Sequence, residues 1–191
     1  MKIMKQLFIL ILFCLGLSFS TFGQEDINPF DKSENISLGI QINSLGSDFG
    51  WGLHLTSPFF AKKKLAVQLS ANAQYYEHVD TAMQSTVWSP YWVFQLGLIA
   101  ASTTIKDFLR LYSHTGGVVA LPNKVFSDKV VDFGVYTKLG VEFLFNANKK
   151  ALGSYFLEGG WIGIFSKANL LPNSPIYGNG FMASTGVRFY F

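Results

Sequence analysis

The chain has 191 residues, a formal net charge of +3 and a single cysteine, Cys14. Lys2 and Lys5 precede the apolar run Leu7–Leu17, which contains this cysteine. We expect residues 1–23 to be a secretory signal peptide, because the run is shorter than the ~20 residues needed to span a bilayer. Its cleavage would lower the formal charge to +1 and leave no thiol, which argues against disulfide chemistry and against a nucleic-acid partner.

Residues 24–35 are polar and form the expected periplasmic lead-in. From residue 36 to 191, apolar side chains recur at every second position, a period that predicts β-strands and that no helix explains. The expected strands cover residues 36–43, 50–56, 65–76, 91–100, 108–119, 131–145, 154–165 and 181–191.

The connections between these strands mostly alternate between short and long. The long ones are Glu77–Pro90, Ala120–Lys129 and Ser166–Gly180, and every proline after residue 23 is expected in a turn, a loop or the lead-in. An even number of strands with alternating short turns and long loops predicts an all-β fold. We expect an eight-stranded antiparallel up-and-down transmembrane β-barrel over residues 36–191.

The composition of the polar face indicates which side is the lumen. A soluble barrel such as a lipocalin also alternates, but its water-exposed face should be rich in lysine and glutamate. Here that face is mostly Gly, Ser, Asn, Gln and Tyr, which is typical of a narrow packed lumen. Its charged residues form the predicted lumen charge layer: Arg110, Asp132, Lys138, Glu142, Glu158 and Arg188. Among these, Arg110, Glu142, Glu158 and Arg188 are expected at one periplasm-proximal level.

Aromatic residues on the apolar face cluster near the strand ends, as in the girdles of a membrane-spanning barrel. The outer girdle would contain Trp51, Tyr75, Trp92 and Phe165. The inner girdle would contain Phe145, Tyr155, Phe189 and Phe191.

The closing strand ends with alternating Val187, Phe189 and Phe191. With the leader and the eight amphipathic strands, this makes the chain resemble the small bacterial outer-membrane barrel proteins of the OmpA/OmpX type. The resemblance implies an integral outer-membrane location and contact with outer-membrane lipid. It also implies that Val187, Phe189 and Phe191 are an assembly signal read by the barrel-assembly machinery.

The sequence carries no motif for catalysis, cofactors or metals. His54, His78 and His114 fall in different elements without metal-ligand spacing. Ser113 and His114 are adjacent, so in a regular strand they face opposite sides and cannot act as a nucleophile–base pair. Outer-membrane lipid deacylases, which resemble this class, use a His-x-Ser arrangement, whereas Gly116 stands two residues after His114.

We therefore expect a monomeric, non-enzymatic barrel with a lumen filled by side chains. Its role would be structural or a surface interaction through the three long loops. One alternative is a narrow channel for ions or small solutes, with the charge layer as its constriction. The second alternative is an outer-membrane lipid enzyme, which would need a histidine and a nucleophile converging near the outer rim.

Overall fold

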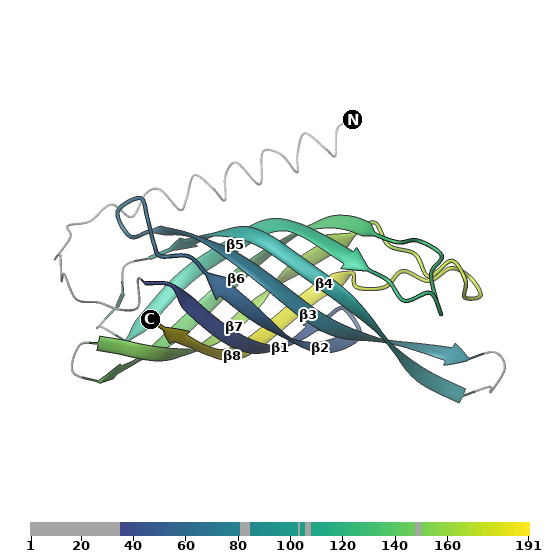
Figure 1. Ribbon diagram of the computed structural model, residues 1–191, viewed down its shortest axis with the longest axis horizontal. Coiled ribbons are helices and arrows are strands. Elements are labelled where there is room, and N and C mark those ends of the chain that lie inside the picture. The colour runs from purple at the N-terminus through teal and green to yellow at the C-terminus, as the bar shows by residue number, and fades with distance from the viewer. Residues whose placement is uncertain (1–34, 81–84, 103, 106–107, 148–149) are drawn as a thin grey trace.

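The structure, a computed structural model, describes residues 35–80, 85–102, 104–105, 108–147 and 150–191. The predicted signal peptide and nearly all of the lead-in lie outside the described residues. Eight strands form a closed barrel, in which each strand pairs antiparallel with the next and β8 pairs with β1 (Figure 1). Their bounds are β1 Ser37–Leu45, β2 Asp48–Thr56, β3 Leu65–Asp80, β4 Ser85–Ala101, β5 Leu109–Leu121, β6 Asp132–Ala147, β7 Lys150–Ile164 and β8 Gly180–Tyr190. The predicted eight-stranded antiparallel barrel is confirmed. Over the described ranges, no helix has the length and apolarity needed to cross a membrane.

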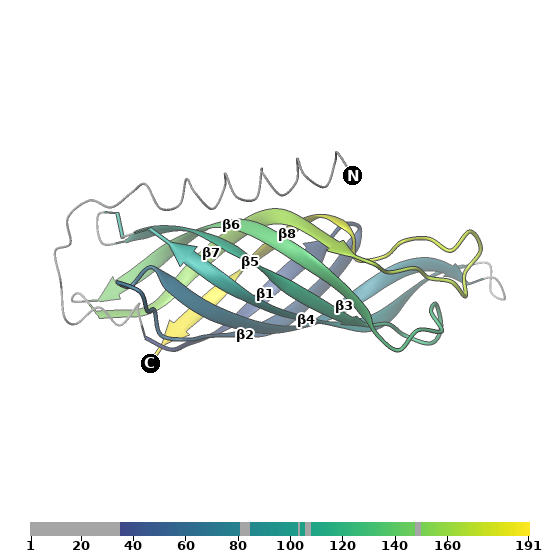
Figure 2. The same ribbon diagram turned by 90° about the horizontal axis from the view of Figure 1, so that it is seen from above.

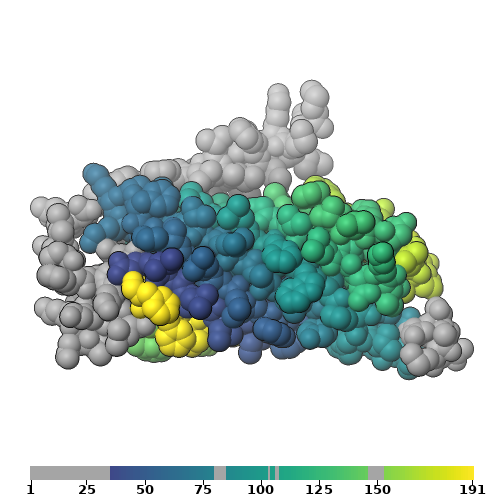
Figure 3. Space-filling view, in the orientation of Figure 1, coloured from purple at the N-terminus to yellow at the C-terminus, as the bar shows by residue number. Residues whose placement is uncertain are grey.

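The two-residue alternation places polar side chains inside and apolar ones outside. In β1, Ser37 and Gln41 are 0% and 1% exposed, whereas Leu38 and Ile40 are 46% and 53% exposed. The register at the seam joins Leu38 to Phe189 in β8, so the apolar face continues across the closure. Figure 3 shows a continuous wall on this face, with the C-terminal residues beside β1.

The barrel has two unlike ends. We call the end with the β1–β2, β3–β4, β5–β6 and β7–β8 connections the loop end, and the opposite end, where β8 finishes, the turn end (Figures 1 and 2). At the loop end, β1 and β2 are joined by two residues, Gly46 and Ser47. Gly46 has a φ of 64°, which glycine adopts without strain, and this explains why so short a turn closes the hairpin.

The β3–β4 hairpin is longer than predicted, and the expected loop Glu77–Pro90 is wrong for most of its length. Pairing continues from Tyr76↔Ser89 to Asp80↔Ser85, and the hairpin extends past the ends of the other strands (Figure 2). We call residues 76–80 and 85–91 the ribbon. Its sequence loses the apolar alternation because a ribbon beyond the barrel has no wholly apolar face, although its backbone still pairs. Pro90 therefore lies in a strand, at a place where pairing with β5 has not yet begun.

The predicted turn over residues 146–153 is also shorter. β6 continues to Ala147 and β7 begins at Lys150, with a register shift between Phe145 and Asn146. Such a bulge lets strands of unequal length remain paired, which the side-chain period alone does not reveal.

Candidate functional site: the closed lumen

Glu142 is the centre of the charged layer inside the barrel. Its carboxylate accepts from the Arg188 Nη1 at 2.9 Å and the Ser154 Oγ at 2.6 Å, and it pairs with the Arg110 Nη1 at 3.4 Å. The Tyr190 hydroxyl donates to the same carboxylate. Glu142 is 0% exposed, so no bulk water solvates its carboxylate. These donors take the place of the water molecules that would solvate the charge on an exposed carboxylate.

A second ion pair lies beside the first. The Lys138 Nζ donates to Glu158 at 2.6 Å, and the Tyr112 hydroxyl donates to the other oxygen of the same carboxylate at 2.7 Å. Arg188 connects the two groups, because its guanidinium lies 5.7 Å from the centroid of the Tyr112 ring. Its Nε also donates to His54 at 3.1 Å. The layer therefore spans the lumen from β2 to β8.

Asp132, which the sequence also assigns to the lumen face, is buried but lies away from this layer. It accepts from the Lys129 Nζ at 2.8 Å and from the Tyr177 hydroxyl at 2.6 Å. As the first residue of β6, Asp132 lies at the loop end, whereas Arg110 and Glu142 pair near the turn end. The alternation along a strand gives the face of a residue but not its height along the barrel, so the sequence assigns Asp132 to the lumen without placing it at the loop end.

Side-chain amides fill the lumen next to β1 and β3. Asn72 accepts from the Gln41 Nε2 at 2.6 Å and from the Asn43 Nδ2 at 2.8 Å, and Gln74 donates to Asn43. All four side chains are at most 4% exposed. This amide cluster occupies the space that an aqueous pore would need.

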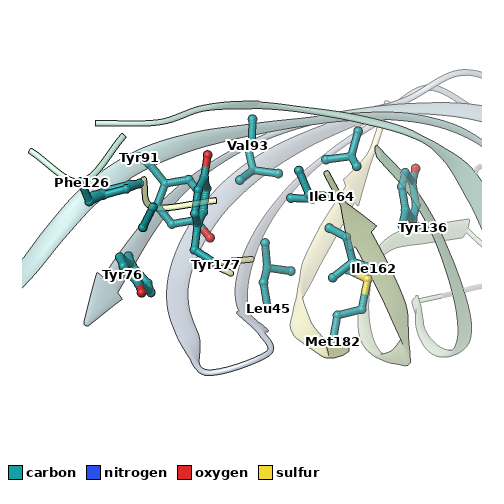
Figure 4. Close-up of a cluster of buried hydrophobic side chains, with 13 residues drawn as sticks. Leu45, Tyr76, Tyr91, Val93, Phe126, Tyr136, Ile162, Ile164, Tyr177 and Met182 are labelled. Atoms are coloured by element: carbon teal, nitrogen blue, oxygen red, sulfur yellow. The ribbon is translucent and has the colours of Figure 1, made fainter. Parts of the chain in front are cut away.

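Two loops close the loop end with aromatic rings that the sequence pattern does not predict. Phe126, from the β5–β6 loop, and Tyr177, from the β7–β8 loop, pack with their ring centroids 5.0 Å apart. Tyr91 and Tyr76 from the hairpin pack against both, as Figure 4 shows. We call these four residues the aromatic plug. Phe126 and Tyr177 stand in loops without any periodicity, so only their aromatic character in otherwise polar segments could have drawn attention to them.

Two carboxylates at the rim hold the β7–β8 loop over the mouth. Asp48 accepts from the Tyr91 hydroxyl at 2.6 Å and from the backbone N–H of Gly178 at 3.0 Å. Asp132 holds the neighbouring Tyr177 hydroxyl. Burial, together with this bond to Asp132, raises the pKa of Tyr177 well above that of a free tyrosine, so its hydroxyl remains a donor.

The two long loops also bind each other. The backbone N–H of Leu170 donates to the carbonyl of Phe126 at 3.1 Å, and that of Asp128 donates to the Asn169 side chain at 3.0 Å. The loops predicted over residues 120–129 and 166–180 thus form a cap on the barrel.

The turn end is closed by Phe59 in the β2–β3 connection. Its ring packs against the buried residues Ala66, Ile99, Ala101 and Tyr112. The Arg110 guanidinium lies 4.8 Å from the ring centroid. The lumen is therefore obstructed at three levels, by Phe59, by the charge layer with the amides, and by the aromatic plug.

All three histidines are buried but stay apart. His54 contacts Arg188, His114 lies 2.6 Å from the Tyr136 hydroxyl, and the His78 Nε2 lies 2.9 Å from the Ser89 Oγ. Within the described residues, no three His, Cys, Asp or Glu side chains are grouped to hold a metal ion. Ser113 is half-buried on the outer face, opposite to the buried His114.

The predicted girdle residues all lie on the outer face. Tyr75 is half-buried, and the exposed fractions of the others run from 37% for Tyr155 to 81% for Phe165. Trp51 and Trp92 flank Ala73 in one register row near the loop end. Phe145 and Phe189 both pair with Gly153 near the turn end. The terminal residue Phe191 is 66% exposed, and its N–H donates to the Ile36 carbonyl at 3.0 Å.

No protein-family model matches the chain, and no curated protein matches it. Among solved structures, the chain is similar to the N-terminal β-barrel domain of Pseudomonas aeruginosa OprF. The TM-score is 0.49 and the identity 15%, over 83% of this chain and 98% of that one. It is also similar to Ail, the attachment invasion locus protein of Yersinia pestis. There the TM-score is 0.43 and the identity 11%, over 82% of this chain and 96% of that one.

Proposed function

We propose that the chain is an integral outer-membrane β-barrel whose lumen is closed by its own side chains and which acts at the cell surface. The observation that carries this proposal is the apolar outer face of a closed barrel. On β6 alone, Phe133, Val135 and Leu139 are 62%, 66% and 73% exposed. Soluble monomers rarely expose such continuous apolar surface, whereas the hydrocarbon core of a bilayer would cover it.

The two ends support an orientation. The turn end, where β8 finishes, would face the periplasm, and the capped loop end with the ribbon would face the outside. This orientation agrees with the resemblance that the closing strand shows to an assembly signal, since Val187, Phe189 and Phe191 then lie at the periplasmic rim.

The four tryptophans offer a direct test of membrane depth. Trp51, Trp92 and Trp161 lie on the apolar outer face, and Trp88 lies on the ribbon. Trp88 is four residues from Trp92, or roughly 13 Å along an extended strand. Variants that keep a single tryptophan should be refolded into vesicles with brominated acyl chains. The fluorescence of Trp51, Trp92 and Trp161 should be quenched and that of Trp88 should not. Equal quenching of all four, or of none, would contradict the proposal.

The ribbon is the part that we propose for surface interaction. Among the described residues, no strand pairs with β3 beyond Tyr75 on its β2 side, nor with β4 before Trp92 on its β5 side. Apart from the carbonyl of Pro90, which accepts from the Asn123 Nδ2 at 3.1 Å, both edges of the ribbon thus present backbone groups to a partner strand, a recognised mode of protein binding. Val79 and Trp88 add exposed apolar surface, at 59% and 50%.

This role is tested by replacing residues 77–88 with an Asn-Gly turn, which leaves the barrel pairs in place. The shortened variant should insert into the membrane as the parent does, but cells that produce it should lose adherence to immobilised proteins. A double variant, Val79→Ser with Trp88→Ser, keeps the edges and should lose only part of the adherence. Full adherence of the shortened protein would exclude the ribbon.

The contact between His78 and Ser89 bears on the lipid-enzyme alternative. The pair lies near the rim, but both residues are at most 8% exposed, and His78 stacks on Tyr76 within the aromatic plug. A serine-reactive phosphonate should therefore leave Ser89 unlabelled. Labelling that Ser89→Ala abolishes would favour the enzyme.

A further inference from the structure

The hydrogen bonds at the two ends of β4 show which of its backbone groups face the open edge of the ribbon. In an antiparallel strand, the N–H and carbonyl of one residue face one neighbouring strand, and those of the next residue face the other. The Ser102 N–H donates to the carbonyl of Leu111 in β5 at 2.8 Å, and the Pro90 carbonyl accepts from Asn123, just after β5. The register along β4 has no shift, so its even-numbered residues face the β5 side throughout.

In the ribbon, the even-numbered residues of β4 are Thr86 and Trp88. Pairing with β5 begins only at Trp92, so among the described residues no strand covers the backbone groups of these two. The segment Ser85–Ser89 contains no charged residue, and its threonine, valine and tryptophan favour strands. An uncharged edge of this kind accepts another strand readily.

The β3 edge of the ribbon is less suited to pairing with a copy of itself. The Val67 carbonyl accepts from the Ser57 N–H on the β2 side, so the odd-numbered residues Glu77 and Val79 face the open edge of β3. Glu77 is exposed. A second copy paired antiparallel about His78 would place the two Glu77 carboxylates diagonally across from each other, roughly 7–8 Å apart. Charged side chains on an edge strand oppose such pairing.

We propose that the β4 edge of the ribbon pairs antiparallel with the same edge of a second copy of this chain. With Val87 on the two-fold axis, Thr86 of each copy lies opposite Trp88 of the other, and all the edge-facing N–H and carbonyl groups of these residues form hydrogen bonds. Both side chains are exposed on the outer face, where an aromatic residue opposite a β-branched one stabilises a sheet. This inference rests on the proposed role of the ribbon in surface interaction.

The direction of the strands determines how the two barrels would be placed. Because the paired β4 strands run in opposite directions, the turn ends of the two barrels point away from each other, and the copies belong to two membranes that face each other. Val87 is five residues from Trp92, or roughly 17 Å along the strand, so the contact lies beyond the barrel wall of each copy. Within one membrane the barrel would stay the expected monomer, and between membranes it would bind to itself.

Proline substitutions test the edge without breaking the hairpin. Thr86→Pro removes an N–H that faces the open edge and none that bonds to β3. Phosphatidylcholine vesicles that carry the parent barrel should cluster, as measured by light scattering. Thr86→Pro should slow clustering by roughly tenfold or more, because two hydrogen bonds are lost in each pair. The matched control, Val79→Pro, removes an N–H at the β3 edge and should cluster as the parent does.

The proposal would be overturned by parent vesicles that do not cluster, or by Thr86→Pro vesicles that cluster at the rate of the parent. A shift in gel mobility on heating, recorded for each variant, verifies that the barrel has folded.

Cysteine cross-linking tests the register. In a Cys14→Ser background the chain has no other thiol. Val87→Cys would place two thiols on a non-hydrogen-bonded pair with about 4.5 Å between the Cα atoms, a separation that a disulfide spans. Two Ser85→Cys thiols would be roughly 13 Å apart, and Val79→Cys lies on the other edge. Mild oxidation should therefore link dimers of Val87→Cys alone. Equal linking at all three positions, or none at Val87→Cys, would contradict this register.

Two further measurements separate this inference from the proposed function, namely insertion into vesicles and adherence to immobilised proteins. The variant without residues 77–88 should lose both adherence and clustering. If it loses adherence while the parent vesicles do not cluster, the ribbon stays an interaction surface and the second copy is rejected as its partner.

Discussion

Arg188 in β8 donates to Glu142 in β6 at 2.9 Å, although β7 lies between these two strands. The contact therefore lies inside the lumen, over the inner face of β7. Glu142 also pairs with Arg110, so one buried carboxylate forms ion pairs with two guanidiniums. This arrangement makes Glu142 the residue on which the interior depends most.

Glu142→Gln should destabilise the barrel by about 3–5 kcal/mol, because it leaves Arg110 and Arg188 buried without this carboxylate. The free energy of unfolding in guanidinium, measured on the protein inserted in vesicles, checks this value. Glu77→Gln is the control, since Glu77 is exposed on the ribbon and its loss should stay within about 0.5 kcal/mol. Equal effects of the two substitutions would show that the charge layer does not hold the barrel together.

Tyr177→Phe should loosen the cap over the loop end. It removes the hydroxyl that donates to the buried Asp132, at a cost of about 1–3 kcal/mol, and should make the β7–β8 loop more sensitive to protease added outside the vesicles. In a double-mutant cycle with Asp132→Asn, the second substitution should cost less than it does alone. Additive effects would mean that the bond does not hold the loop.

Gly140→Ala should destabilise the barrel by about 1–3 kcal/mol. A methyl group on Gly140 would lie 2.3 Å from the Tyr112 ring, whose hydroxyl donates to Glu158. Gly163→Ala is the matched control, because no described heavy atom lies within 4 Å of the added carbon. Alanine lowers the conformational entropy of the unfolded chain, so this change should be neutral or stabilising. The two unfolding midpoints should therefore move in different directions or by clearly different amounts.

The sequence predicts the wall of the barrel well because a strand has only two faces. The alternation of side chains between the two faces of a strand places Gln41 inside and Ile40 outside. The same alternation brings Glu142 and Arg188 into one lumen. It does not give heights, since these depend on the stagger between strands, so it does not reveal that Asp132 lies near the end opposite to Glu142.

The ends of the barrel are less predictable for a different reason. Apolar alternation reports which face of a strand is apolar and exposed, so it stops where the ribbon leaves the apolar belt, although the hydrogen-bonded pairing continues to Asp80 and Ser85. The plug residues Phe126 and Tyr177 occupy loops, where no period predicts direction. Their inward position depends on tertiary partners, Asp48 and Asp132 among them, that are distant in sequence.

Single-channel conductance of the refolded barrel in a planar bilayer tests the closed lumen most directly. With insertion verified by a shift in gel mobility on heating, the parent protein should give no discrete conductance steps, because the aromatic plug, the charge layer and Phe59 obstruct the lumen at three levels. Discrete steps whose size or ion selectivity changes in Glu142→Gln would contradict the closed lumen and make the charge layer the filter of a channel.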